Sequence, residues 1–175
     1  MKKDHRVFLV FLLNGFFYTL TVELNQMLAS FSLQLSLESL LLLFPALFLR
    51  LLPGLCLVSI TALLIDAALP LPFGTRLGIY CLIYILLVYW RPRIRRENLL
   101  HLTGLSLLAN LVFMITLSVC MAGELWLSSF YWSRVLTDLL ISQIALVFIT
   151  AWFIQFILSI LLLFGINIEA ELQTL

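Results

Sequence analysis

A succession of six apolar runs, separated by short polar connections, constrains this chain more than any other feature. The runs cover residues 7–22, 37–52, 53–69, 77–90, 99–122 and 135–164. A helix needs about 17 to 25 mostly apolar residues to cross a hydrocarbon core of about 30 Å. Because 63% of the residues are hydrophobic and 11% are charged, a water-soluble fold would lack polar surface. The pattern predicts an all-α integral membrane protein, with one six-helix transmembrane domain over residues 1–175.

The apolar stretch 37–69 requires a break in its middle. Its 33 residues would form a helix of about 50 Å, which is too long for a single span. Arg50 and the Pro53-Gly54 pair supply that break. We therefore expect two short spans joined by a tight turn.

Lysine and arginine are distributed unevenly among the connections. Basic residues accumulate in cytoplasmic loops, and six spans with a cytoplasmic N-terminus place eight of the ten basic residues on that side. The main cytoplasmic anchor is then the cluster Arg91, Arg93, Arg95 and Arg96. Both termini are expected in the cytoplasm. A nucleic-acid site or a specific lipid site at this cluster is the alternative to a simple topology anchor.

Residues 31–38, between the first two runs, alternate strictly between apolar and polar side chains. A period of two indicates an extended segment with one apolar side. A short strand or the frayed start of a helix would both fit, because leucine dominates and β-branched residues are missing.

Asp66 is a carboxylate at the end of an otherwise apolar run. The negative end of the helix dipole disfavours a carboxylate at the end of a helix. We therefore expect backbone N–H groups of the following turn to donate hydrogen bonds to Asp66 and offset this cost. Arg76 is a candidate ion-pair partner. Ser59 and Ala62 lie on the same helix face as Asp66. The main interpretation is a turn organiser; a proton or ligand carrier is the alternative.

Other polar residues inside the spans are expected to mediate contacts between helices or with a partner. Thr103, Ser106 and Asn110 form one stripe at helical spacing, and Asn14 lies in the first run. Such residues commonly hydrogen-bond between membrane helices. A small-molecule pocket lined by them is the alternative.

Catalytic patterns are not evident in the sequence. The two histidines are far apart, and neither an HExxH nor a Gly-x-Ser-x-Gly motif occurs. We expect a protein that is not an enzyme, with no catalytic residues, no metal site and no cofactor.

The stretch from Leu64 to Leu77 resembles the signature of the MreD family of bacterial rod shape-determining membrane proteins. A helix ends in Leu-x-Asp at Asp66, and Pro72 and Gly74 follow six and eight residues later. The order of the spans and the basic loop after the fourth are also similar to the family. The chain departs from it at Ala62, where members often carry glycine, and at the start of the second span, where Ser36-Leu37-Glu38-Ser39 stands in place of a proline motif.

This resemblance implies a scaffold in the bacterial inner membrane that maintains rod cell shape during peptidoglycan synthesis. MreD-like proteins bind MreC and act through it with the elongation transpeptidase, the SEDS glycosyltransferase and MreB. Their fold is similar to the substrate-binding S components of energy-coupling-factor transporters for vitamins or metals. It also implies that Asp66, Pro72 and Gly74 form a structural turn.

An S component is the main rival interpretation. Such subunits dock through an Ala-xxx-Ala surface on their first helix, and residues 7–22 contain no alanine. An intramembrane enzyme or transporter that uses Asp66 is the third class.

Overall fold

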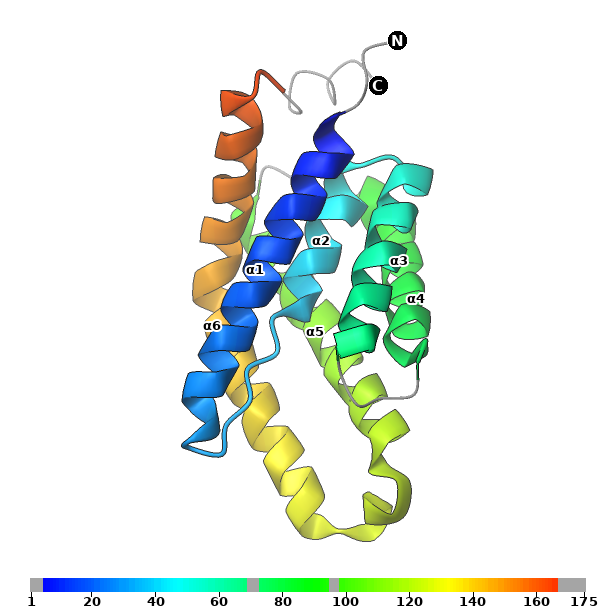
Figure 1. Ribbon diagram of the computed structural model, residues 1–175, viewed down its shortest axis with the longest axis vertical. Coiled ribbons are helices and arrows are strands. Elements are labelled where there is room, and N and C mark those ends of the chain that lie inside the picture. Colours follow the sequence, from blue (N-terminus) through cyan, green and yellow to red (C-terminus); the bar gives the residue numbers. More distant parts are fainter. Residues whose placement is uncertain (1–4, 69–72, 95–97, 167–175) are drawn as a thin grey trace.

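The computed structural model describes residues 5–68, 73–94 and 98–166, and these residues form helices and short connections without any strand (Figure 1). The α-helices are α1 (His5–Ala29), α2 (Glu38–Phe48), α3 (Leu51–Ala68), α4 (Thr75–Trp90), α5 (Leu99–Ala122) and α6 (Ser129–Leu163). Two short 3-10 helices, η1 (Arg91–Arg93) and η2 (Gly123–Leu127), follow α4 and α5. The predicted all-α class is confirmed for this part of the chain.

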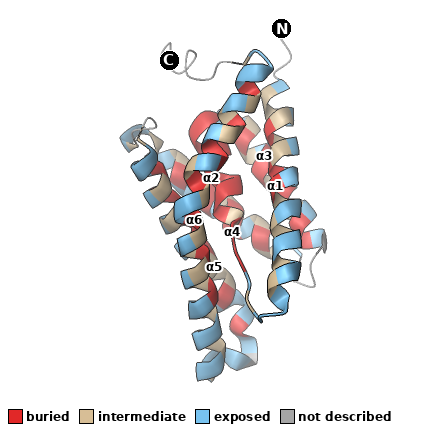
Figure 2. Ribbon diagram, turned by 90° about the vertical axis from the view of Figure 1, so that its left-hand side faces the viewer, coloured by how far each residue is buried: buried red, intermediate tan, exposed pale blue. Residues whose placement is uncertain are grey.

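Helix α2 lies at the centre of the bundle. Ten of its eleven residues are buried, and it contacts all the other α-helices. Figure 2 shows this burial as a red core between α1, α5 and α6. A helix that is apolar on every side is stable only when other elements surround it, and α2 is therefore the central helix of the hydrophobic core.

Helix α1 packs against α6 through aromatic rings. Phe17 is buried, and its ring centroid lies 4.4 Å from that of Phe153 in an edge-to-face arrangement. Trp152 and Phe156 also make edge contacts with Phe17. Edge-to-face geometry places the positive ring edge on a negative ring face, and it stabilises the pair beyond the area that it buries.

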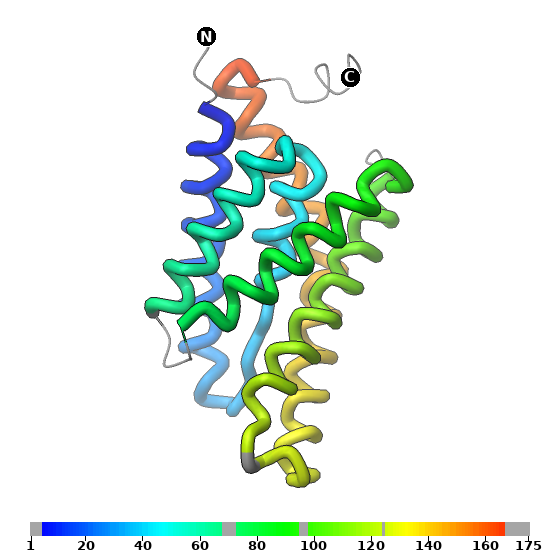
Figure 3. Tube along the Cα trace, turned by 90° about the vertical axis from the view of Figure 1, so that its right-hand side faces the viewer, coloured from blue at the N-terminus to red at the C-terminus, as the bar shows by residue number. Residues whose placement is uncertain are grey.

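Three described helices, α1, α5 and α6, are long and apolar enough to cross a membrane. Helix α6 has 35 residues and a length of about 52 Å, well above a hydrocarbon core of about 30 Å. In Figures 1 and 3 the hairpin of α5 and α6 extends beyond the ends of the other helices. The chain thus has the helices of a membrane protein, while the six-span topology and the cytoplasmic termini stay predictions.

The break in the stretch 37–69 lies at Leu49 and Arg50, slightly before the predicted boundary at residue 53. Pro53 is the third residue of α3, where its missing N–H would have had no partner inside the helix. The first bond of α3 runs from the Gly54 amide to the Arg50 carbonyl, at 3.0 Å. Proline therefore belongs to the new helix and does not form the joint.

Several other helix ends differ from the predicted ones. Helix α6 begins six residues before the predicted position 135, and the Ser128 hydroxyl accepts from the Tyr131 amide at its start. Helix α1 continues to Ala29, through the polar residues after position 22. Helix α5 has the predicted bounds, and the Asn98 side chain caps it by accepting from the Leu100 amide.

The alternating segment 33–37 has no regular secondary structure and is hydrogen-bonded to both α1 and α6. Side chains of α1 and α6 supply the backbone hydrogen bonds that a neighbouring strand would otherwise make. Gln34 and Ser36 donate their amides to Asp138 and to the Ser142 hydroxyl of α6. Leu35 donates its amide to Asn25 Oδ1 of α1 and accepts from Asn25 Nδ2. The amides of residues 34, 35 and 36 thus point alternately to opposite sides, as in an extended chain. The predicted segment 31–38 is longer than this, because residues 31 and 32 lie in a turn and Glu38 begins α2.

Candidate functional site

The carboxylate of Asp66 joins the end of α3 to the start of α4. Asp66 is buried, and its two oxygens accept from the backbone amides of Gly74, Arg76 and Leu77 at 3.0, 3.3 and 3.4 Å. These amides belong to the first turn of α4, where the helix leaves its N–H groups unpaired. The positive end of the α4 dipole also favours a carboxylate there. Asp66 therefore acts as a distant N-cap, as expected of a turn organiser.

Gly74 is the N-cap residue of α4 and has a φ of +94°. An L-residue with a side chain rarely adopts this left-handed conformation, whereas glycine does so freely. The predicted need for glycine is explained by the backbone, because a Cβ atom here would meet no other atom within 4 Å. Pro72, the third residue of the expected turn motif, lies outside the described residues.

Arg76 pairs through its side chain with Glu38 and not with Asp66. Its Nη1 atom donates to Glu38 Oε1 at 2.8 Å, and both side chains are largely buried. The Tyr80 hydroxyl donates to the other carboxylate oxygen, Oε2, at 2.5 Å. This cluster ties the start of α2 to the first two turns of α4. The expected Asp66–Arg76 contact is made by the Arg76 backbone amide only.

Sequence reasoning missed the Glu38–Arg76–Tyr80 cluster, although one signal for it was present. Glu38 and Arg76 are opposite charges, and each stands at the start of an apolar run on the same predicted side of the membrane. Charges at membrane depth are costly unless they find partners. Two such residues of opposite sign are therefore expected to pair.

Asn14 connects α1 to α2. It is buried, and its Nδ2 atom donates to the Leu41 carbonyl at 3.0 Å. Asn14 therefore makes a contact between two helices. On the α3 stripe, Ala62 is buried, and the half-buried Ser59 lies with its hydroxyl 3.6 Å from the Cys81 sulfur of α4.

The three polar residues of the α5 stripe differ in what their side chains contact. Ser106 lies with its hydroxyl 3.5 Å from that of Ser39 in α2. Asn110 is buried, and neither of its side-chain polar atoms has a partner among the described residues. Thr103 donates to the Leu99 carbonyl of its own helix at 2.9 Å, so this hydrogen bond is not between helices.

Two of the four anchor arginines are described. Arg91 is half-buried and donates from Nη1 to the Leu49 carbonyl at 2.6 Å, across the joint between α2 and α3. Burial lowers the pKa of its guanidinium, although the side chain stays protonated near neutral pH. Arg93 is exposed, and Arg95 and Arg96 lie outside the described residues. Arg91 thus also stabilises the fold.

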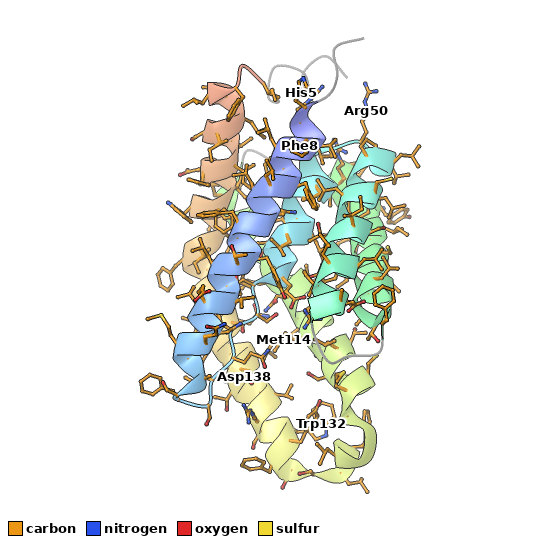
Figure 4. All side chains as sticks on the ribbon, viewed as in Figure 1. His5, Phe8, Arg50, Met114, Trp132 and Asp138 are labelled. Carbon is orange, nitrogen blue, oxygen red and sulfur yellow. The ribbon has the colours of Figure 1, made fainter. Side chains whose placement is uncertain are left out.

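A cavity of about 450 Å³ lies beside the Glu38–Arg76 pair. Its walls come from α1, the extended segment with the adjoining first residue of α2, the start of α4, α5 and the start of α6. Figure 4 labels two lining residues, Met114 on α5 and Asp138 on α6. Cavities of about 300 to 1,000 Å³ that combine apolar walls with a few polar groups are typical of ligand sites.

Comparison with protein-family models, curated proteins and solved structures finds no match for this chain.

Proposed function

We propose that this chain is a non-enzymatic scaffold of the bacterial cell-wall elongation complex, located in the inner membrane, where it binds MreC. Through MreC it would act with the elongation transpeptidase, the SEDS glycosyltransferase and MreB to maintain rod shape. The proposal begins from the resemblance of the stretch 64–77 to the MreD signature.

One observation carries this proposal: the Asp66 carboxylate is buried, and it accepts hydrogen bonds from backbone amides at the start of α4. A carboxylate engaged in this way holds two helices at a fixed joint, and it accepts three hydrogen bonds from the protein itself. This is the geometry expected of a turn that presents a defined helical surface to a partner. It does not favour a residue that carries protons or a solute.

The other buried polar groups have the same character. Asn14, Ser142 and the Glu38–Arg76 pair each connect different elements of the bundle. Hydrogen bonds of this kind fix the relative positions of membrane helices. A rigid bundle with an apolar exterior is suited to binding a single transmembrane helix such as that of MreC.

The test is deletion of the gene in its own rod-shaped host, combined with crosslinking and copurification of the tagged chain from native membranes. We expect deleted cells to lose rod shape and MreC to be the main crosslinked protein. Cells that stay rod-shaped with MreC in place would contradict the scaffold. Copurification of a transporter coupling module in place of MreC would instead indicate an S component.

A further inference from the structure

The cavity beside Glu38 and Arg76 has features that the scaffold function does not use. Two acid–base pairs face it. Glu38 and Arg76, with side chains 12% and 7% exposed, form the inner pair, and Asp138 and Arg134, 10% and 55% exposed, form the outer one. The formal charges cancel, so the cavity favours neither a simple anion nor a simple cation. A ligand that carries both signs complements it best.

The inner pair has a free donor for an anionic oxygen. Arg76 Nη1 is bound to Glu38, while Arg76 Nε is buried and has no partner among the described residues. The hydroxyl of Ser36, which also lines the cavity, is buried and unpartnered in the same way. A guanidinium presents its N–H groups in a fork that suits phosphate and carboxylate oxygens. An anionic oxygen at Arg76 Nε would complete this arrangement.

The outer pair has a free acceptor for a cation. Asp138 Oδ1 accepts from the Gln34 amide, whereas Oδ2 lies 4.0 Å from Arg134 Nε, beyond hydrogen-bond distance. A primary ammonium carries several N–H donors, and it can therefore reach Oδ2 while it also contacts neighbouring acceptors. A quaternary ammonium has no N–H group and cannot make this bond.

Part of the cavity lining is apolar. Phe113, Met114, Leu117 and Met121 of α5 and Val135 of α6 line the cavity there. Methionine side chains adapt to ligands of different shape. The residues that line the cavity also include the C-terminal half of α1, the first turns of α2 and α4, the last part of α5 and the first part of α6. In a membrane protein, polar head groups and the first carbons of lipid chains meet at such helix ends.

We propose that this cavity binds a phosphoethanolamine head group, with a phosphate oxygen at Arg76 Nε, the ammonium at Asp138 and an apolar tail along α5. The shared chemistry is a phosphate joined to a primary ammonium. It can come from phosphatidylethanolamine in the membrane or from a soluble phosphoethanolamine ester. This inference does not require the chain to bind MreC.

The experiment is native mass spectrometry of the full chain, purified in detergent and titrated with dioleoyl phosphatidylethanolamine or dioleoyl phosphatidylcholine. The two lipids differ only in the methyl groups on nitrogen. We expect phosphatidylethanolamine to bind about tenfold more tightly or better, because only its ammonium can donate to Asp138. Equal binding of the two lipids would overturn the proposal.

Two variants test whether the lipid binds in this cavity. Asp138→Asn removes the charge that receives the ammonium, and Met114→Trp fills the cavity without touching either charged pair. Leu111→Trp is the matched control, since Leu111 is exposed on the same helix and does not line the cavity. We expect the preference for phosphatidylethanolamine to disappear in Met114→Trp and to persist in Leu111→Trp. A preference that survives Met114→Trp would overturn the proposal, even if Asp138→Asn failed to fold.

The source of the head group is decided by competition. Glycerophosphoethanolamine lacks acyl chains, so displacement of the lipid by this compound at low concentration would identify a site for soluble esters. Displacement that requires the intact phospholipid would identify a site for membrane lipid. Both results support the shared chemistry, whereas displacement by glycerophosphocholine at the same concentration would contradict it.

Discussion

The side-chain amide of Asn14 donates to the Leu41 carbonyl at 3.0 Å, and this carbonyl lacks the donor that an α-helix normally supplies. In an α-helix the Leu41 carbonyl would accept from the amide of residue 45, but residue 45 is proline and has no N–H. A buried carbonyl without a donor is costly. Asn14 of α1 thus supplies to α2 the hydrogen bond that Pro45 removes.

This relationship predicts a coupling between Asn14 and Pro45. We expect Asn14→Ala to lower the free energy of unfolding by about 1 to 3 kcal/mol, because the Leu41 carbonyl is left unpaired. In the background of Pro45→Ala, residue 45 regains its N–H and can satisfy Leu41 itself. The cost of Asn14→Ala should then fall below about 1 kcal/mol. A double-mutant cycle of unfolding in detergent measures this coupling.

The control for this cycle is Thr19→Ala, on the exposed face of α1, where the hydroxyl bonds within its own helix. It should change stability by about 0.5 kcal/mol or less. Additive effects of Asn14→Ala and Pro45→Ala would show that the two residues do not share Leu41.

Gly74 and Gly78 provide a matched pair for the conformation of the α3–α4 turn. A Cβ atom at either position would meet no other atom within 4 Å, but only Gly74 has a positive φ. We expect Gly74→Ala to lower stability by about 1 to 2 kcal/mol. Gly78→Ala should be neutral or stabilising by up to about 1 kcal/mol, because alanine favours helix. Thermal unfolding of the two variants in one detergent checks this, and equal shifts would contradict the assignment of strain to Gly74.

The Glu38–Arg76 pair is expected to be strongly coupled because it is buried. Replacing one partner alone, as in Glu38→Gln or Arg76→Gln, leaves the other charge buried and should cost about 3 to 5 kcal/mol. The double variant should cost clearly less than the sum of the two. The comparison is Arg134→Gln, whose exposed side chain lies 4.0 Å from Asp138 and should change stability by about 1 kcal/mol or less. Strict additivity of the Glu38 and Arg76 variants would argue against a buried ion pair.

The extended segment is expected to depend on two different side chains of α6. Asp138→Ala removes the acceptor of the Gln34 amide, and Ser142→Ala removes the acceptor of the Ser36 amide. Each variant should raise hydrogen exchange at its own amide by roughly tenfold, which corresponds to one lost hydrogen bond. Residue-resolved exchange measured by NMR checks this. Each variant serves as the control for the other, and faster exchange at both amides in both variants would instead indicate collapse of the whole segment.

Local relationships in the sequence were predictable. Asp66 and Gly74 are eight residues apart, so the acid at a helix end and the glycine in the turn could be interpreted together. The need for a break in the stretch 37–69 follows from helix length, and Arg50 and the Pro53-Gly54 pair indicated its approximate position. The alternation of residues 31–38 indicated an extended segment, because a period of two is a property of the backbone itself.

Relationships between distant residues could not be predicted in the same way. Gln34 and Asp138 are 104 positions apart, and Glu38 and Arg76 are 38 apart. The α-helices that the structure describes are all rich in apolar residues, so hydrophobic periodicity does not indicate which helices are neighbours. The cavity depends on that arrangement, because its walls come from five separate segments.

The small size of α2 has a consequence for how the protein is made. Its 11 residues are too few to enter a bilayer as an independent span, which takes about 17 or more. The segment must therefore be carried in with α1 and α3 and reach its final place only when α4, α5 and α6 have been synthesised to enclose it. A polypeptide that is cut short before α5 would leave the faces of α2 that contact α5 and α6 uncovered.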